Sequence, residues 1–180
     1  IGPALKTWKS LVVEAVDGSQ VHLPDETFGS DIGRVFGVHR GLSMALMVTC
    51  CDVLQNVVNQ AVLCPFRTND RWVALRWLKN CPAGALRLYD RGFGSAALMY
   101  WHLKYKVPFV IRLKLDFNTQ VKDFVQSGRK EQVAHFAISY KAKYLAQKGL
   151  PTPIGARVTV RLIRVELPNA EVEVLATSLY

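Results

Sequence analysis

Two aspartates stand out because each follows a strongly apolar run. Asp17 comes after residues 11–16, and Asp90 comes after residues 85–89. Both runs predict buried strands, and a carboxylate beside a buried strand is costly unless it is solvated, paired or metal-bound. If the strands are neighbours, the two carboxylates could share a divalent cation, Mg²⁺ or Mn²⁺, and serve phosphoryl transfer. The alternative is that each aspartate is a solvated turn residue, and Asp17-Gly18 is a favourable turn dipeptide.

The residues around Asp17 predict strands joined in hairpins. After the run 11–16, the chain would turn at Asp17-Gly18 and return through residues 20–23. Residues 24–41 are polar and rich in glycine, which predicts a loop. Residues 43–63 then predict a second hairpin.

Helices and strands alternate around Asp90. A helix capped near Asp70 would end before Pro82, and residues 85–89 would form the strand that delivers the aspartate. A second helix would run from Gly94-Ser95 to about Tyr105, followed by a strand over residues 109–115. Hairpins followed by a helical crossover predict a mixed sheet with helices packed on it.

The C-terminal third is less regular. Residues 119–126 and 130–147 predict helices, and residues 149–155 predict a linker because they contain two prolines. Residues 157–167 and 171–176 alternate apolar and polar side chains, which predicts an antiparallel hairpin.

Composition bounds the class of protein. The chain has 180 residues, of which 50% are hydrophobic and 21% charged, so it can form a globular core and is not a disordered tail. Its longest apolar stretch, residues 45–51, is far shorter than the roughly 18 residues of a membrane-spanning helix, so we expect no membrane partner. No C-x-x-C pair occurs, and the cysteines are interpreted as reduced thiols of a cytosolic protein: Cys50, Cys51, Cys64 and Cys81.

Basic side chains concentrate in the second half of the chain. The formal net charge is +9, and residues 101–180 alone carry 13 basic and 6 acidic side chains. An excess of this kind favours a polyanionic partner such as nucleic acid.

Three short sequence motifs carry a resemblance to a known family. They are Val-Asp-Gly-Ser at 16–19, Leu-Tyr-Asp-Arg-Gly-Phe-Gly-Ser at 88–95, and Phe-Val-Ile-Arg-Leu-Lys at 109–114. In this order and on these elements, they resemble the DDE transposases of bacterial insertion sequences. The first motif is nonspecific alone, and the ordered set is what distinguishes the family. The resemblance is good from residue 11 to about 117 and implies an RNase H-like α/β fold.

The resemblance also implies a reaction. Asp17 and Asp90 would hold Mg²⁺ or Mn²⁺ while water attacks the phosphodiester at a transposon end. The 3′-hydroxyl that is released would then attack target DNA. The implied partners are transposon ends and target DNA, with the full-length protein acting as a dimer in the bacterial cytoplasm at the nucleoid.

The third acidic residue of the family is a glutamate in a helical motif with Tyr, Arg and Lys, and this sequence contains no matching motif. Glu166, Glu171 and Glu173 lie in strand-like sequence. We therefore expect a fragment. Residues 1–118 would be the RNase H-like core with both aspartates, and residues 119–180 a helical segment plus part of a strand-rich insertion. Such a chain would be inactive by itself.

Basic residues near the two later motifs are the candidates for phosphate contacts. Arg91 follows the second aspartate, and Arg112 and Lys114 would share one face of a strand because side chains alternate. A solvated sheet edge is the alternative interpretation of all three. Other basic residues could extend the surface: Lys104, Lys106, Lys122, Arg129, Lys130, Lys141 and Lys143.

Other functions fit parts of the sequence. Residues 92–97 match the relaxed dinucleotide fingerprint G-x-G-x-x-A, and Asp116 ends the next predicted strand, as in a dinucleotide-binding oxidoreductase. Asp90-Arg91 counts against it, because a carboxylate would sit beside the pyrophosphate. A non-catalytic DNA-binding remnant of the same fold, or another RNase H-like nuclease such as a resolvase, also remains open.

Overall fold

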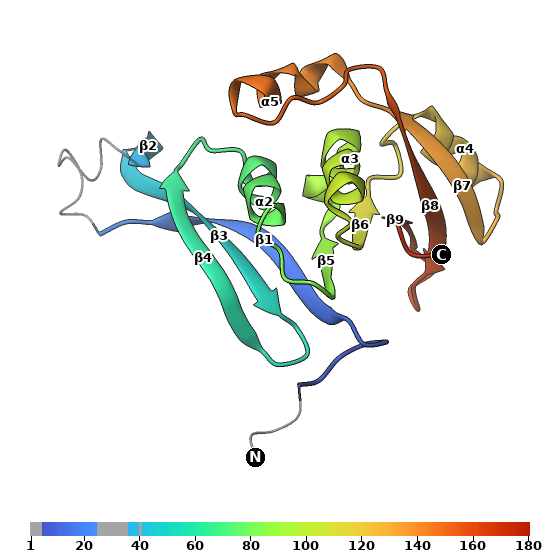
Figure 1. Ribbon diagram of the computed structural model, residues 1–180, viewed down its shortest axis with the longest axis horizontal. Helices are drawn as coiled ribbons and strands as arrows, with labels where there is room; N and C mark the ends of the chain where they lie inside the picture. The colour runs from blue at the N-terminus through green and yellow to red at the C-terminus, as the bar shows by residue number, and fades with distance from the viewer. Residues whose placement is uncertain (1–4, 25–35, 40) are drawn as a thin grey trace. The chain divides into compact units, whose positions relative to one another are not determined.

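A computed structural model describes residues 5–24, 36–39 and 41–180 of the chain (Figure 1). The chain divides into two units, Ile1–Trp77 and Leu78–Tyr180. Of the predicted loop over residues 24–41, residues 25–35 and 40 lie outside the described residues, and Val38–His39 form the short strand β2 rather than loop.

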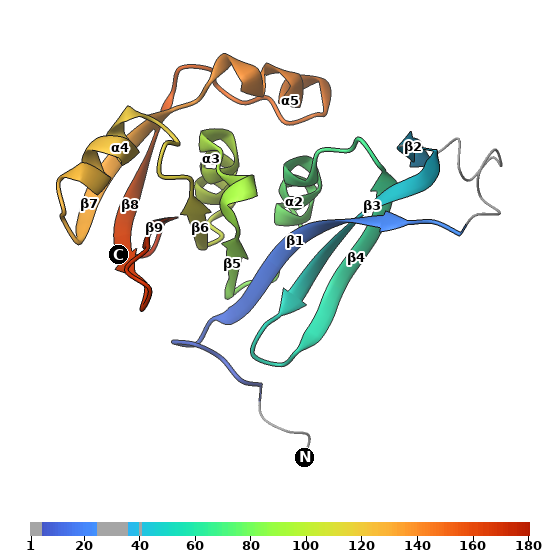
Figure 2. The same ribbon diagram turned by 180° about the vertical axis from the view of Figure 1, so that it is seen from behind.

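The first unit is built on an antiparallel sheet. β3 (Leu42–Asp52) pairs with β1 (Val12–His22) on one side and with β4 (Val57–Pro65) on the other, while β2 (Val38–His39) pairs with the first residues of β3. Figure 2 shows β1, β3 and β4 side by side from behind. The predicted hairpin over residues 43–63 is confirmed.

β1 corrects one prediction. It runs without interruption from Val12 to His22, with Asp17 opposite Thr49 and Gly18 opposite Val48 of β3. The predicted turn at Asp17-Gly18 and the separate return strand are therefore wrong. The turn preference of Asp-Gly is overridden because β3 offers a ladder partner at each of these positions.

A glycine allows the helix α2 (Asp70–Leu78) to approach β1 closely. α2 begins as predicted, and the Asn69 side chain accepts a hydrogen bond from the backbone N–H of Arg71 at 3.0 Å. A Cβ placed on Gly18 would lie 3.1 Å from the Cβ of Asp70. The glycine after Asp17 therefore serves close packing between a strand and a helix rather than a turn.

The second unit contains a parallel strand pair. β5 (Ala85–Tyr89) and β6 (Phe109–Leu113) are parallel and are joined through the 3₁₀ turn η2 (Arg91–Phe93) and the helix α3 (Ala96–Tyr105). Ser95 caps α3, since its hydroxyl accepts from the backbone N–H of Leu98. The predicted strand–helix–strand order is confirmed.

Three antiparallel strands extend this sheet beyond β6. β8 (Arg157–Glu166) pairs with β7 (Glu131–Ala137) and with β9 (Val172–Thr177), and β9 in turn pairs with β6. The order in the second unit is therefore β5-β6-β9-β8-β7. The predicted hairpin of β8 and β9 and the predicted helix α4 (Thr119–Gln126) are confirmed.

The predicted helix over residues 130–147 is wrong. Residues Glu131–Ala137 form β7, and only two short helical turns follow, η3 (Tyr140–Lys143) and α5 (Tyr144–Gln147). Only Ala134 and Phe136 of β7 are buried, so its alternation was too brief to be distinguished from a helical pattern.

A buried histidine ties α3 to the strand before Asp90. His102 is 0% exposed, and its Nδ1 lies 2.9 Å from the carbonyl oxygen of Val107. Because a carbonyl only accepts, Nδ1 carries the proton, and the Tyr89 hydroxyl donates to Nε2 at 2.9 Å. Burial lowers the pKa of His102 to about 3, so the ring is neutral at pH 7.

No helix in the described parts of the chain has the length and apolar character needed to cross a membrane.

Candidate active site

Asp90 is exposed directly after a buried strand. Tyr89 is 6% exposed, whereas the Asp90 side chain faces solvent and caps η2, accepting a hydrogen bond from the backbone N–H of Gly92 at 2.8 Å. A Cβ on Gly92 would lie 3.0 Å from Oδ1 of Asp90. The glycine of the Asp-Arg-Gly-Phe motif thus has a local physical reason, because a side chain at this position would crowd the Asp90 carboxylate where it folds back onto the turn.

Asp17 is exposed in the middle of β1. Its neighbour Val16 is 3% exposed and faces the core, so strand alternation turns the Asp17 carboxylate away from the core. Asp17 belongs to the first unit and Asp90 to the second. A shared metal ion between these two carboxylates stays a prediction.

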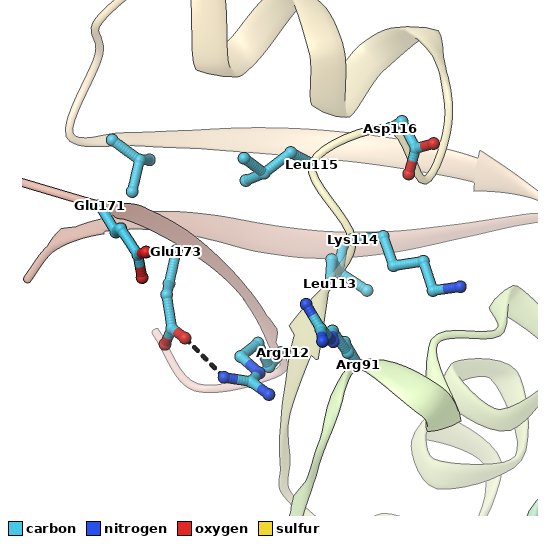
Figure 3. Close-up of a pocket in the computed structure, with 9 residues that line it drawn as sticks. Arg91, Arg112, Leu113, Lys114, Leu115, Asp116, Glu171 and Glu173 are labelled. Atoms are coloured by element: carbon cyan, nitrogen blue, oxygen red, sulfur yellow. Dashed lines mark hydrogen bonds and ion pairs between the residues drawn. The ribbon is translucent and has the colours of Figure 1, made fainter.

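The three predicted phosphate contacts line one groove of the second unit. Arg91, Arg112 and Lys114 surround a space of about 660 Å³ (Figure 3). They come from η2, from β6 and from the residue after β6. The structure brings these side chains together, and their contact with DNA stays a prediction.

Carboxylates line the same groove. Arg112 Nη1 lies 2.6 Å from Oε1 of Glu173. Arg112 faces Leu175 across the β6–β9 ladder, so Glu173 occupies the diagonal position on the same face. With Asp116 and Glu171 included, three carboxylates offset the three cations, and the groove has no net formal charge.

Sequence reasoning considered Glu173 only as a third metal ligand and missed its pairing with Arg112. The two residues are 61 positions apart, and their contact depends on the non-local pairing of β6 with β9. The available signal was the opposite charge pattern of two strands, Arg112 and Lys114 on one and Glu171 and Glu173 on the other.

A third acidic ligand is not assembled in the described part of the chain. Among residues 5–24, 36–39 and 41–180, no three His, Cys, Asp or Glu side chains are grouped so that they could hold a metal ion. Glu166 is paired with Arg164 at 3.1 Å, and Glu173 is paired with Arg112. None of the glutamates in these ranges lies in a helix, where the resemblance would place the third acid.

The geometry disfavours the dinucleotide alternative. β5, α3 and β6 do form a strand–helix–strand unit with the glycines at its turn. However, the backbone N–H of Gly92, which a pyrophosphate would need, already donates to Asp90. The next strand in the sheet, β9, is antiparallel to β6 and does not continue a parallel dinucleotide-binding sheet.

Comparison with solved structures identifies the class of fold. The chain has an RNase H-like α/β fold, with parallel and antiparallel strands flanked by helices, and it resembles a piggyBac transposase chain solved by cryo-EM in a synaptic complex with hairpin DNA. The match has a TM-score of 0.51 and 11% sequence identity, and it covers 93% of this chain and 33% of that chain. This chain thus spans about a third of the length of that transposase.

The family model of the transposase DDE domain matches residues 8–177. The chain therefore belongs to the transposase DDE domain family. No curated protein matches the chain.

Proposed function

We propose that this chain is part of the catalytic core of a DNA transposase, a polynucleotidyl transferase that cleaves phosphodiesters at transposon ends and joins them to target DNA. The observation that carries this proposal is the position of Asp90. It is an exposed carboxylate at the end of a buried strand, next in sequence to a cation of the groove that holds Arg112 and Lys114.

Asp17 and Asp90 are the proposed metal ligands. Both carboxylates are exposed, and carboxylate oxygens are the hard donors that Mg²⁺ and Mn²⁺ prefer. Oδ1 of Asp90 is held by the Gly92 N–H, which fixes the orientation of the carboxylate and leaves Oδ2 available. When bound, the divalent cation would supply Lewis-acid stabilisation of the charge that develops on the phosphodiester oxygens.

The groove is the proposed place for DNA phosphates. Arg112 and Lys114 would position the backbone beside Asp90, with Arg91 on the η2 side. A phosphate must compete with Glu173 for the Arg112 guanidinium, because the two side chains are already ion-paired. The groove would therefore orient a bound strand, while the net positive charge elsewhere on the chain attracts it.

The proposal extends to the partners. Transposon ends and target DNA are the substrates, and two copies of the full-length protein would hold paired ends in the bacterial cytoplasm at the nucleoid. The family resemblance supports these points.

The 180-residue chain alone is proposed to be inactive in cleavage, because no described glutamate occupies a helix as the third acid requires. The second candidate is a non-catalytic DNA-binding remnant of the same fold. The absence of a helical glutamate among the described residues also favours this candidate. Unlike a catalytic core, such a remnant would need no metal ion at Asp17 and Asp90.

Calorimetric titration of the chain with Mn²⁺ distinguishes the two candidates. Asp17→Asn and Asp90→Asn should each weaken Mn²⁺ binding by at least roughly ten-fold, since each removes a charged ligand. Asp123→Asn on α4 is the matched control, because it removes an exposed carboxylate outside the proposed site and should leave binding unchanged. Equal Mn²⁺ affinity in the unaltered chain and its three variants would contradict the proposed metal site and favour the DNA-binding remnant.

A further inference from the structure

The connection between β7 and β8 is long and closed at its base. The backbone N–H of Ile138 donates to the carbonyl of Ala156 at 2.8 Å, and the N–H of Gly155 donates to the carbonyl of Ile138 at 3.0 Å. These two bonds separate residues 139–154 from the hairpin as one excursion (Figure 1). Hairpin loops usually have 2–5 residues, and much longer connections commonly carry function.

Two buried apolar side chains anchor this connection, while Tyr140 lies at its surface. Ala142 is 7% exposed and Leu145 is 1% exposed, whereas Tyr140 is 68% exposed. The return of the chain is fixed by a hydrogen bond of 2.9 Å from Trp101 Nε1 on α3 to Thr152 Oγ1. The connection is thus held at its base and along its return, so the Tyr140 ring is presented from a fixed support.

The charge of this connection is of one sign. Residues 138–156 contain Lys141, Lys143 and Lys148 and no acidic side chain. Lys143 Nζ lies 5.2 Å from the centroid of the Tyr140 ring and 3.4 Å from its hydroxyl oxygen. An exposed aromatic ring flanked by lysines thus stands in contrast to the groove beside Asp90, whose charges cancel.

We propose that the β7–β8 connection binds single-stranded DNA, with one unpaired base stacked on Tyr140 and the flanking phosphates held by Lys141 and Lys143. Stacking of bases on aromatic side chains, combined with cationic contacts to the backbone, is how proteins bind single strands without sequence readout. The inference rests on DNA being the substrate of the proposed function, and it assigns a separate surface to an unpaired part of that DNA.

The geometry favours a single strand over a duplex. In a duplex each base is stacked on its neighbours, so the face that Tyr140 needs is not available. The helical turns η3 and α5 have only four residues each and offer little length to lie in a major groove. A protruding ring with adjacent lysines suits an unstacked nucleotide instead.

The test uses the chain with a single-stranded oligonucleotide that contains 2-aminopurine, and with the corresponding duplex. Stacking on Tyr140 should quench 2-aminopurine fluorescence. Tyr140→Ala should remove the quenching and weaken single-strand binding by roughly ten-fold, while duplex binding stays the same. Tyr140→Phe should preserve both signals because the ring remains. Tyr180→Ala, which removes another exposed tyrosine, is the control and should change neither.

The lysines are tested through salt dependence. Each phosphate contact to a single strand contributes roughly 0.7 to the slope of log K against log salt. Combined Lys141→Gln and Lys143→Gln should therefore reduce the slope by about 1.4. Lys79→Gln, at an exposed lysine just after α2 and outside the connection, is the control and should leave the slope unchanged.

The outcomes separate this inference from the proposed function. Unchanged quenching and single-strand affinity in Tyr140→Ala would overturn the inference while duplex binding and Mn²⁺ binding stand. If the unaltered chain binds neither form of DNA at low salt, the inference fails together with DNA as the partner. Loss of single-strand binding alone supports the assignment.

Discussion

Arg112 and Glu173 form an ion pair across the β6–β9 ladder, with Nη1 2.6 Å from Oε1 and with side chains 39% and 27% exposed. The pair lies inside the groove that also holds Arg91 and Lys114. Because both side chains remain partly hydrated, the pair is weak enough to be exchanged for another anion. If a phosphate enters the groove, as proposed, it would have to compete with Glu173 for the Arg112 guanidinium.

Glu173→Gln should strengthen duplex DNA binding. The substitution keeps the shape of the side chain and removes the competing charge, which leaves Arg112 available for one more phosphate. The slope of log K against log salt should become steeper by roughly 0.9. Fluorescence anisotropy at several salt concentrations measures both quantities.

Glu131→Gln is the matched control. Glu131 is also a strand glutamate paired with an arginine, Arg161, but it lies outside the groove. Glu131→Gln raises the net charge of the chain by one unit, as Glu173→Gln does. Equal gains in affinity from the two substitutions would show a general charge effect and contradict a local role for Glu173.

Gly92→Ala should disturb Asp90 without unfolding the chain. The new Cβ would lie 3.0 Å from Oδ1 of Asp90, so the carboxylate must rotate away from the Gly92 N–H. We expect Mn²⁺ affinity to fall several-fold in calorimetry, with a loss of unfolding free energy of about 1 kcal/mol for the cap.

Gly94→Ala controls for the loss of a glycine in the same turn. Its Cβ would meet Leu113 and Phe117 at 3.4 Å and would not reach Asp90. Mn²⁺ affinity should be unchanged in this variant. A similar loss in both variants would indicate that the turn as a whole, rather than the Asp90 carboxylate, had moved.

His102 should make the stability of the chain depend on pH. Its pKa is lowered to about 3 by burial, whereas the unfolded chain titrates near the ordinary value of 6.5. The contribution of His102 is therefore complete above pH 6.5 and is lost as the pH falls toward 3, because only the unfolded state takes up the proton. Between pH 7 and pH 5 the free energy of unfolding should drop by about 2 kcal/mol.

His102→Gln should flatten this dependence. Urea unfolding at pH 7 and pH 5 measures the difference, and His22→Gln, at an exposed position of β1, serves as the control. The glutamine variant is expected to be less stable at pH 7, since it disturbs the bonds to Val107 and Tyr89. An unchanged slope with pH would exclude His102 as its source.

Gly18→Ala should destabilise the first unit. The added Cβ would lie 3.1 Å from the Cβ of Asp70, so α2 must shift away from β1 by a few tenths of an ångström. We expect a loss of about 1 kcal/mol in unfolding free energy, as for overpacking elsewhere. Ser19→Ala, at the next, exposed position, should have no such effect, and equal stability of the two variants would argue against the close contact.

The sequence predicted the elements that local signals define. The β3–β4 hairpin, the capped helices and the strand before Asp90 follow from apolar runs and capping residues. Two errors came from long-range pairing, which overrode the turn preference of Asp17-Gly18 and recruited residues 131–137 into the sheet. The position of Glu173 beside the predicted phosphate contacts was missed for the same reason, because Glu173 meets Arg112 only through the pairing of β9 with β6.

The place of β9 in the sheet has a consequence for synthesis of the chain. β9 is the last strand in sequence, yet it lies between β6 and β8. A ribosome delivers the β7–β8 hairpin before the strand that links it to β6 exists. Until Val172–Thr177 emerges, the hairpin lacks its backbone ladder to β6 and is held only by contacts such as the hydrogen bond from Trp101 to Thr152. Nascent chains halted before that segment should therefore be more sensitive to proteases in residues 131–166 than the complete chain.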